Sequence, residues 1–244
     1  SMRWSRWNWR LVLVRPRNPL NIGAAARAMA NFGFRDLVLV APHPPVWEEA
    51  RSAVGGEEVI QSARVVKNLP QAVGDRTLVV GTTSGSRRNL NRELVPLAEL
   101  PTWLRRQGRR HTQAALLFGS EKTGLANEHL SYCHALVRIP TSPHCPSMNL
   151  GQAVAVCCYE LARSGAVAVQ PASTTVHLSG PADIQSLEHV FERATRVLDR
   201  AGYLKPKSRD AALVKVRRLL LDLGLTNSDV RLSLIHISEP TRPY

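Results

Sequence analysis

Short, continuous apolar runs alternate with helix-type spacing along the first two thirds of the chain. Leu11–Val14 and Leu37–Val40 each consist of four consecutive apolar residues. Runs of this kind are typical of parallel strands that are buried on both faces. Similar runs recur at Leu78–Val80, Ala114–Phe118 and Ala135–Ile139. The pattern predicts an α/β fold in which a parallel sheet is covered by helices on both faces.

The segments between these runs predict the helices. Asn21 as N-cap and Gly33 as stop indicate a helix over about residues 22–32. Further helices are expected over about residues 47–53, 95–106 and 148–163. The last of these carries Gly151, Ala153 and Ala155 in its early turns; small residues allow another backbone to come close, and the glycine does so at some cost in helix propensity. We therefore expect a second segment to pack tightly against its first turns.

The pattern changes after residue 165. Residues 166–180 are rich in small and hydroxyl-bearing side chains, which is typical of a linker. Apolar spacing then predicts one helix over about residues 181–201, with Pro181 in its first turn, and a second that begins after Ser208 and ends at Gly224. The expected parts are a main domain (9–165), a linker (166–180), a helical extension (181–232) and a non-native tail (233–244) that breaks the helical pattern.

The extension needs a partner surface because two amphipathic helices do not form a stable core alone. The main domain, a second copy of the chain and a substrate are all open as that surface. The formal net charge of +13 favours a polyanionic partner, with nucleic acid the first candidate. Near the N-terminus, Trp4, Trp7 and Trp9 alternate with arginines. These rings would either stack on bases or cover the first strand or a dimer surface.

Other chemistries find little support in the sequence. The four cysteines form no CxxC pair and the eight histidines are scattered, so we expect reduced cytoplasmic thiols and no metal site. No apolar run approaches the roughly 20 residues of a membrane span, and no signal peptide is evident. The lysine of FGSEKTG does not follow a glycine directly, so the nucleotide-binding P-loop pattern is not matched, and the glycine fingerprint of dinucleotide-binding oxidoreductases is missing.

Three polar loops at strand ends remain, and together they resemble one family. Their sequences are NPLNIGAAAR, GSEKTGL and IPTSPHCPSMNLG. They match, in order, the motifs NxGxxxR, FGxExxGL and IPxxxxxxSxN of the SPOUT superfamily, in its TrmH-like branch of RNA 2′-O-methyltransferases. The helical extension resembles that of the TrmJ type, which modifies the tRNA anticodon loop. The matching residues are Asn21, Gly23 and Arg27; Phe118, Gly119, Glu121, Gly124 and Leu125; and Ile139, Pro140, Ser147 and Asn149.

The resemblance implies a five- or six-stranded sheet whose last segment is threaded into a deep C-terminal trefoil knot. It also implies that S-adenosylmethionine (SAM) is held in the knot, largely by backbone groups. A homodimer is implied as well, joined through the first and last helices of the main domain, with the arginine of one subunit completing the other's site. The residues expected to contact the cofactor are Thr82, Thr83, Ser84, Gly119, Ile139, Pro146, Ser147 and Met148.

The same resemblance suggests Arg27, Asn21, Glu121, Ser147 and Asn149 as catalytic residues. A guanidinium has a pKa above about 12, so we expect Arg27 to clamp the target phosphate and polarise the hydroxyl rather than act as base. Glu121 is expected to orient Arg27, while Ser147 and Asn149 position the cofactor and the hydroxyl. Taken from the residues alone, Asn21 and Ser147 also fit helix caps, and Glu121 also fits a solvated loop charge.

The expected function is therefore SAM-dependent 2′-O-methylation of a pyrimidine ribose, at position 32 of the tRNA anticodon loop. The same chemistry on ribosomal RNA is one alternative. A knotted RNA-binding protein without catalysis is another, although the intact motif residues argue against it.

Overall fold

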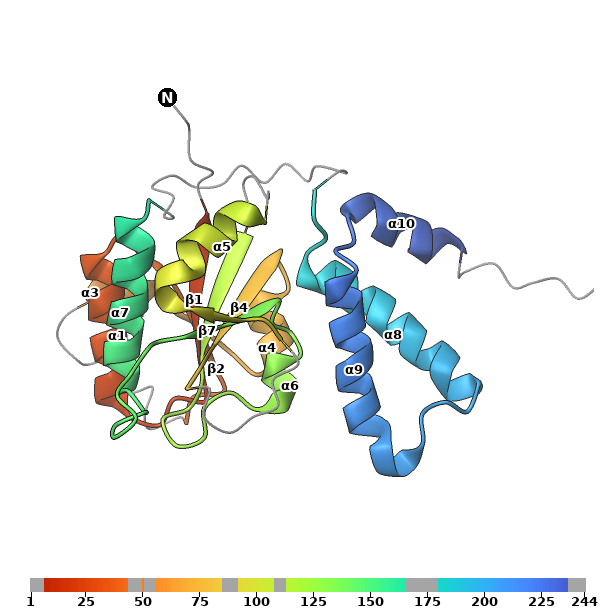
Figure 1. Cartoon of the computed structure of the whole chain (residues 1–244), viewed down its shortest axis with the longest axis horizontal. Coiled ribbons are helices and arrows are strands. Elements are labelled where there is room, and N and C mark those ends of the chain that lie inside the picture. The colour runs from red at the N-terminus through yellow and green to blue at the C-terminus, as the bar shows by residue number, and fades with distance from the viewer. Residues whose placement is uncertain are drawn as a thin grey trace, which may run out of the picture.

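The central feature of the computed structural model is a parallel sheet of seven strands among the residues it describes, which are 7–43, 50, 56–84, 92–107, 113–165 and 180–236 (Figure 1). The strand order is β3-β2-β1-β6-β4-β7-β5, and every pairing is parallel. All five predicted strands form, and two short edge strands, β3 and β5, join them. The strands are β1 (Asn8–Val14), β2 (Asp36–Val40), β3 (Arg64–Val66), β4 (Leu78–Thr83), β5 (Leu94–Pro96), β6 (Gln113–Phe118) and β7 (Ala135–Arg138).

Helices cover both faces of this sheet (Figure 1). The predicted helix over 95–106 is wrong at its start, because residues 94–96 pair with β7 as strand β5. The helix predicted over 47–53 falls outside the described residues, apart from Ala50. The main-domain helices are α1 (Pro19–Asn31), α3 (Glu57–Ser62), α4 (Leu69–Val73), α5 (Leu100–Arg106, after a 3-10 turn at Leu97–Glu99), α6 (Asn127–Leu130) and α7 (Leu150–Arg163).

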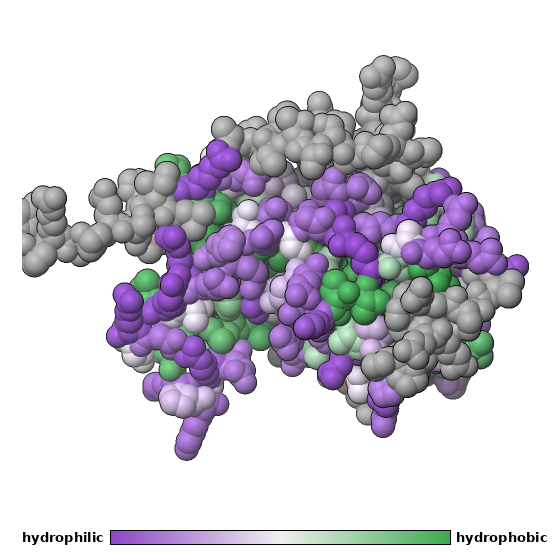
Figure 2. Space-filling view, turned by 180° about the vertical axis from the view of Figure 1, so that it is seen from behind, coloured by the Kyte–Doolittle hydropathy of each residue, from purple (hydrophilic) through white to green (hydrophobic). Residues whose placement is uncertain are grey.

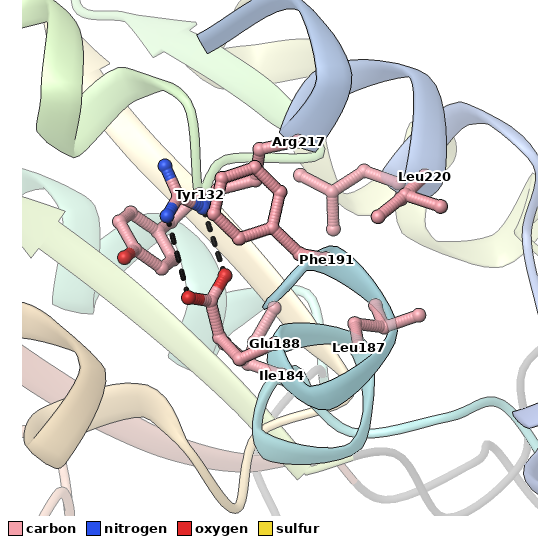
Figure 3. Close-up of a pocket in the computed structure, with 8 residues that line it drawn as sticks. Tyr132, Ile184, Leu187, Glu188, Phe191, Arg217 and Leu220 are labelled. Atoms are coloured by element: carbon pink, nitrogen blue, oxygen red, sulfur yellow. Dashed lines mark hydrogen bonds and ion pairs between the residues drawn. The ribbon is translucent and has the colours of Figure 1, made fainter. Parts of the chain in front are cut away.

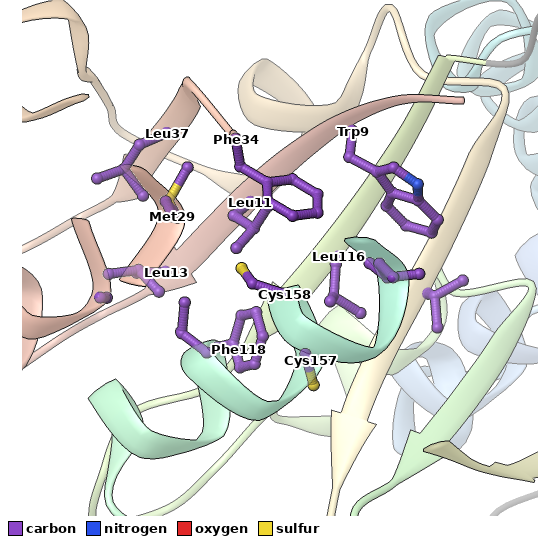
Figure 4. Close-up of a cluster of buried hydrophobic side chains, with 14 of the residues drawn as sticks. Trp9, Leu11, Leu13, Met29, Phe34, Leu37, Leu116, Phe118, Cys157 and Cys158 are labelled. Carbon is purple, nitrogen blue, oxygen red and sulfur yellow. The ribbon is translucent and has the colours of Figure 1, made fainter. Parts of the chain in front are cut away.

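Alternating side chains of each strand feed two separate cores. In β1, Leu11 and Leu13 point to the face covered by α1 and α7, where Cys157, Cys158 and Phe118 complete the packing (Figure 4). The intervening residues of the same strand point to the opposite face, under α4 and the extension. Burial of both faces explains why the strands read as continuous apolar runs rather than as an alternation.

The close approach predicted at the start of the last main-domain helix is confirmed. A Cβ placed on Gly151 of α7 would lie 2.6 Å from the Cβ of Ala24 in α1. No side chain larger than hydrogen fits this crossing, so the small residues keep α1 and α7 in direct contact. This contact fixes the position of the two helices that carry Asn21, Arg27 and Asn149.

The burial of the N-terminal tryptophans decides in part whether they can stack on bases or instead cover protein surface. Trp7 and Trp9 stack on each other at a centroid distance of 6.2 Å and are 3% and 4% exposed. They cover the first strand and are not available to bases, while Trp4 lies outside the described residues. All four cysteines are free, and burial raises the pKa of the Cys133 and Cys158 thiols to about 12.

Some of the positive charge is used inside the protein. Arg10 of β1 is 5% exposed and donates to Asp36 at 2.8 Å, to Asp75 at 2.5 Å and to the carbonyl oxygen of Ala72 at 2.8 Å. Although partial burial opposes ionisation, hydrogen bonds from Arg76 and Arg10 hold the pKa of the Asp75 carboxyl well below its usual range. This network ties the start of β1 to α4 and is not a ligand site.

The helical extension packs on the main domain, which answers the question that the sequence left open. It consists of α8 (Ile184–Arg200), a 3-10 turn (Pro206–Ser208), α9 (Arg209–Asp222) and α10 (Asn227–His236). The N–H groups of Ile184 and Gln185 donate to the carbonyl oxygens of Arg76 and Gly74, at 2.9 and 2.7 Å. The first turns of α8 thereby continue the buried core beneath β4 and α4.

Both predicted ends of the extension need correction. Helix α8 begins three residues after Pro181, because the side chain of Asp183 caps it by accepting from the N–H of Ser186 at 2.8 Å. Pro181 instead forms an antiparallel bridge with Thr226. Helix α10 continues to His236, so the helical pattern does not break at residue 233. None of the helices in the described ranges is long and apolar enough to cross a membrane.

Arg217 of α9 joins the extension to the main domain (Figure 3). Its guanidinium lies between the rings of Tyr132 and Phe191, at 4.3 and 4.1 Å from their centroids, and donates to Glu188 at 2.8 and 3.3 Å and to Ser131 at 3.2 Å. The cavity beside it is about 10 Å³. This is at the lower limit for one water molecule and far too small for a substrate. The cluster is therefore a structural junction.

Replacing Arg217 with alanine is expected to lower the free energy of unfolding by about 2 to 3 kcal/mol, because a largely desolvated ion pair and two cation–π contacts are lost together. Limited proteolysis should then cut within α8 and α9 before the main domain. Arg196→Ala, which removes an exposed arginine of the same two-helix unit, is the control and should leave the urea midpoint unchanged. Equal midpoints for both variants would contradict the junction.

Candidate active site

Three stretches named from the sequence lie side by side at the carboxyl edge of the sheet. Strand β4 lies between β6 and β7, with Gly81 opposite Leu117 and Thr83 opposite Arg138. The chain therefore leaves these strands at neighbouring points, through residues 82–84, Gly119 and Ile139. Open parallel sheets bind ligands at this edge. The strand order therefore brings together those predicted cofactor residues that lie at strand ends, namely Thr82, Thr83, Ser84, Gly119 and Ile139.

Glu121 connects the loop after β6 with the loop after β1. Its Oε1 accepts from the side-chain Nδ2 of Asn21 at 2.9 Å and from the N–H of Asn18 at 3.1 Å, and its Oε2 accepts from the N–H of Arg17 at 3.0 Å. The two loops are adjacent because β1 pairs with β6, with Leu13 opposite Phe118. The carboxylate is therefore a structural tie between two of the three motifs and not a free loop charge.

Asn21 extends the same network to the third motif. Its Oδ1 accepts a hydrogen bond from Nδ2 of Asn149 at 2.8 Å, and its own Nδ2 donates one to Glu121. Asn21 is 8% exposed, so both polar ends of its side chain are satisfied within the protein. The chain Glu121–Asn21–Asn149, which we call the motif network, joins all three sequence motifs through direct hydrogen bonds.

The residues that cap α1 and α7 are not the ones predicted from the sequence. Because Asn21 is not a cap, its side chain can take part in the motif network. Asn18, not Asn21, caps α1, because its Oδ1 accepts from the N–H of Leu20 at 2.9 Å and Pro19 fits the first helical position. Asn149, not Ser147, caps α7, with its Oδ1 accepting from the N–H of Gln152 at 3.3 Å. Asn21 is thereby released from a capping role. Gly33 does end α1, with a φ of +81°.

Hydrogen bonds keep Glu121 ionised. Although partial burial favours its protonated form, donation from Asn21, from its own N–H and from the N–H groups of Arg17 and Asn18 lowers the pKa of this carboxyl below its ordinary value of 4.5. Protonation therefore weakens the folded state only when the pH falls below that ordinary value. The motif network is intact at neutral pH.

This shift gives a testable pH dependence. The stabilisation from ionised Glu121 is fully present above about pH 4.5 and is lost as the pH falls through the lowered pKa. Glu121→Gln removes the charge, so the variant should melt below the parent at pH 7, and the two melting curves should converge once the pH has fallen below the lowered pKa of Glu121. Thermal unfolding measured across this range checks the sign. A difference that grows on acidification would contradict it.

A tight turn positions Glu121. The N–H of Gly124 donates to the carbonyl oxygen of Ser120 at 2.8 Å, and Gly124 has a φ of +65°. A Cβ on Gly119 would lie 2.1 Å from the carbonyl carbon of Gly124 and 2.2 Å from the nitrogen of Leu125. The two glycines of the motif therefore have separate roles, one in backbone conformation and one in close approach.

The remaining cofactor candidates lie around this edge. Thr82 Oγ1 donates to the carbonyl oxygen of Leu117 at 2.8 Å, so this hydroxyl supports the sheet. The loop from Ile139 to Asn149 is braced by Thr141 Oγ1, which donates to the carbonyl oxygen of Pro146 at 3.0 Å. Ile139 and Met148 are half-buried, while Ser84, Pro146 and Ser147 are exposed. Thr83 ends strand β4 and is half-buried.

Arg27 stands apart from this network. It is exposed on α1, in one stripe with Leu20, Ala24 and Asn31. Within the described residues its side chain forms no ion pair or hydrogen bond, and the partners of Glu121 do not include it. The expected orientation of Arg27 by Glu121 is therefore not seen within this chain.

The described residues do not contain a cluster of three or more His, Cys, Asp or Glu side chains arranged to hold a metal ion.

A comparison with known families identifies the fold and the motifs together. Residues 8–159, which span every strand of the sheet and most of α7, match the SpoU rRNA Methylase family. This chain belongs to the SpoU methylase family. The match includes the three loops of the motif network, so the hydrogen bonds described above lie within the part of the chain that matches the family.

Named relatives of this SpoU methylase align with part of the chain beyond residue 159 as well. The tRNA (cytidine/uridine-2′-O-)-methyltransferase TrmJ of Klebsiella pneumoniae is 34% identical over 215 residues, 87% of each chain. The tRNA (cytidine/uridine/adenosine-2′-O-)-methyltransferase TrmJ of Pseudomonas aeruginosa is 34% identical, over 86% of this chain and 84% of its own. The crystal structure of TrmJ from Z. mobilis ZM4 superposes with a TM-score of 0.78 and 28% identity, over 94% and 97% of the chains. The resemblance stated from the sequence is confirmed, and the protein is a methyltransferase.

Sequence reasoning missed the backbone part of the site. The N–H groups of Arg17 and Asn18 donate to Glu121 in addition to the side chain of Asn21. Backbone donors carry no residue signature, so the sequence offers no direct sign of them. The pair Asn18-Pro19 was nevertheless a readable signal for the true helix start, since Asn at N-cap and Pro at the next position is a common combination.

Proposed function

We propose that this SpoU methylase transfers a methyl group from SAM to the 2′-hydroxyl of a pyrimidine ribose at position 32 of the tRNA anticodon loop. The observation that carries the proposal is the motif network at the carboxyl edge, in which Glu121, Asn21 and Asn149 join three loops from distant parts of the chain. The net charge of +13 supports a polyanionic substrate.

The choice of tRNA over ribosomal RNA rests on the extension. The family that matches residues 8–159 is described by rRNA methylation. The relatives from K. pneumoniae and P. aeruginosa align over 87% and 86% of this chain, which includes part of the region beyond residue 159, and both are named for tRNA. Ribosomal RNA stays the second candidate because of the family description.

The residues at the carboxyl edge fit SAM. Among the described residues, the N–H groups of Ser147 and Met148 donate to no protein acceptor, and they lie in the loop that leads into α7. Such donors suit an adenine edge or a carboxylate. Gly119, where a side chain has no room, keeps the facing loop close. We expect Thr82, Thr83, Ser84, Gly119, Ile139, Pro146, Ser147 and Met148 to line this site. SAM supplies a methyl group that is already activated by the sulfonium.

The chain's own residues have three tasks in the transfer. Arg27 binds the phosphate next to the target ribose and polarises the hydroxyl, while solvent or that phosphate accepts the proton, because a guanidinium does not. Ser147 and Asn149 hold the cofactor and the hydroxyl in line. Asn21 and Glu121 are positioning residues, since they fix Asn149 and the loop that contains Gly119.

The proposal includes the knot. After β7 the chain runs through residues 139–149 and enters α7, where Asn149 lies within hydrogen-bond distance of Asn21, whose other partner is Glu121. The start of α7 is thus linked directly to α1 and, through Asn21, to the loop after β6. This arrangement supports a threaded C-terminal segment, which is a known exception to the rule against threaded connections.

The proposal also includes a homodimer through α1 and α7. Leu20 of α1 is 72% exposed, and Val156 and Tyr159 of α7 are 37% and 54% exposed. These exposed apolar side chains lie on two helices that pack directly on each other, and Arg27 lies in the same exposed stripe of α1 as Leu20. An isologous contact through these helices would bring each Arg27 toward the partner subunit.

A charge at this contact should separate the subunits. Tyr159→Glu is expected to convert a dimer into a monomer at micromolar concentration, because a carboxylate cannot be buried in an apolar interface without cost. Sedimentation velocity measures the change. Tyr203→Glu places the same substitution at an exposed position of the extension and should remain dimeric. Monomeric parent protein would contradict the interface.

The proposed function is tested by methyl transfer from radiolabelled SAM to purified tRNA and, separately, to ribosomal RNA. Label in tRNA alone is expected. Label only in ribosomal RNA would keep the chemistry and overturn the substrate. Absence of label in both, with SAM still bound, would favour a catalytically inactive RNA-binding protein.

A further inference from the structure

The turn between α8 and α9 carries a second basic surface, separate from the motif network. We call it the hairpin tip and define it as Arg196, Arg200, Tyr203, Lys205 and Lys207. All five residues are exposed, and Tyr203 is 75% exposed, the largest value among the exposed large hydrophobic residues of the described chain. One exposed aromatic ring and four cations therefore lie between residues 196 and 207, in the last turns of α8 and the turn that follows it.

The four cations of the hairpin tip are not used within the protein. Among the described residues, none of them forms a hydrogen bond or ion pair, in contrast to Arg209, which pairs with Asp199. Between residues 196 and 210 the sequence has five arginines and lysines against two aspartates. Since Asp199 is already paired, the tip presents a clear excess of positive charge to solvent.

The backbone of Tyr203 is fixed although its ring is exposed. Gly202 has a φ of +73°, and the N–H of Tyr203 donates to the carbonyl oxygen of Leu198 at 2.9 Å, which closes the C-terminus of α8. The ring therefore projects from an ordered helix end rather than from a loose loop. The ion pair between Asp199 and Arg209 joins α8 and α9 at the same turn.

The hairpin tip points toward the side of the molecule where the active-site loops lie. In Figure 1 the turn between α8 and α9 is at the lower end of the view, as are α6 and the loop that enters α7. In Figure 2, seen from behind, hydrophilic residues gather over this tip at the lower left. The first turns of α8 are anchored to Gly74 and Arg76, before β4, so the helix leads away from the amino edge of the sheet.

We propose that the hairpin tip is an RNA-binding surface on which Tyr203 stacks against an unpaired base while the four cations contact the flanking phosphates. The inference rests on the proposed function, since it assigns a second contact to the same RNA substrate. Aromatic stacking combined with a basic surface is the usual chemistry of single-stranded RNA recognition. An anionic membrane fits less well, because the apolar stripe of α8 formed by Ile184, Leu187 and Phe191 is buried against the protein and is not exposed for insertion.

The test compares Tyr203→Ala with Tyr203→Phe in the full chain. RNA binding is measured with unmodified tRNA transcript in the absence of SAM, and SAM binding is measured separately by calorimetry. We expect Tyr203→Ala to weaken tRNA binding about tenfold or more, the effect of losing one stacked base, and Tyr203→Phe to stay within about twofold of the parent. SAM affinity should not change in either variant.

The charges are tested by salt dependence. Lys205→Ala combined with Lys207→Ala should reduce the slope of log affinity against log salt by roughly 1.4, which corresponds to two single-strand phosphate contacts. Lys67→Ala removes an exposed lysine after strand β3 and is the control for charge alone. An unchanged slope in the double variant would overturn the proposal.

The outcomes separate this inference from the proposed function. If Tyr203→Ala binds tRNA as tightly as the parent protein, and the parent methylates tRNA, RNA binding by the hairpin tip is refuted and the proposed function stands. Methyl transfer to ribosomal RNA only would refute the tRNA function, and the same variants would then be scored with that RNA. Binding to anionic lipid vesicles that the tip variants lose, with RNA affinity unaffected, would replace RNA by a membrane surface.

Discussion

Replacing Arg27 with alanine is expected to reduce methyl transfer on the order of a thousandfold, while the dissociation constant for SAM stays within about threefold of the parent value. The reason is that Arg27 is exposed and forms no hydrogen bond or ion pair within the described residues, so its loss leaves the motif network unchanged. Its contribution is therefore to the substrate phosphate and the reacting hydroxyl. Single-turnover rates with tRNA and calorimetry with SAM measure the two quantities.

Arg27→Lys is the matched control for this experiment. A lysine keeps the positive charge but cannot bind a phosphate through two parallel N–H groups, so an intermediate rate is expected. The thermal midpoint should be the same for all three proteins. Loss of SAM affinity in proportion to the loss of rate would count against the clamp and would place Arg27 in the cofactor site.

Gly119→Ala is expected to abolish SAM binding and methyl transfer together and to lower the free energy of unfolding by about 2 kcal/mol or more. Even one methyl group at this position would lie 2.1 to 2.2 Å from the backbone of Gly124 and Leu125. The turn would have to open, and Glu121, which lies within it, would lose its bonds to Asn21 and to the loop after β1. Equilibrium unfolding and SAM calorimetry test this directly.

The control for Gly119 lies in the same turn. Gly124 has a φ of +65° but open space around its missing side chain, so Gly124→Ala adds backbone strain of about 1 kcal/mol without a collision. This variant should keep measurable SAM binding. Similar losses in both variants would show that backbone conformation, and not the close approach at Gly119, decides the outcome.

The two variants together test the shared site. If Arg27 acts in the partner's site, a mixed dimer of Arg27→Ala and Gly119→Ala subunits has one site with an intact cofactor loop and an intact arginine. Equal mixing and subunit exchange should then recover about a quarter of the parent activity, since half of the dimers are mixed and each has one complete site. Absence of recovery, with mixed dimers demonstrated, would place Arg27 in its own subunit's site.

Much of the fold follows from the sequence because both faces of the sheet are buried. Residues such as Leu11 and Val12 point to opposite cores, which gives continuous apolar runs that are easily recognised. Strands β3 and β5 were missed because each has three residues at a sheet edge, and Val65 and Leu94 are partly exposed. A run this short has no periodicity to detect, and Val95 and Pro96 were consequently predicted as the start of a helix.

The sequence predicted which residues belong to the site, but not the hydrogen bonds that join them. Asn21, Glu121 and Asn149 were chosen as motif residues, and the structure joins these three by hydrogen bonds. The strand order that places them together depends on the pairing of β1 with β6, which local patterns do not encode. The link between Glu121 and Arg27 was expected from charge alone, and the backbone N–H groups that hold Glu121 instead have no sequence signature.

The most direct test of the central claim is nucleoside mapping of tRNA after reaction with the purified protein and SAM. Mass spectrometry of nuclease fragments should show one added methyl group on the ribose of a cytidine or uridine at position 32, and no methylated base. Arg27→Ala, treated in the same way, should give the unmodified fragment. A methyl group on a base, or on a ribose outside the anticodon loop, would contradict the account.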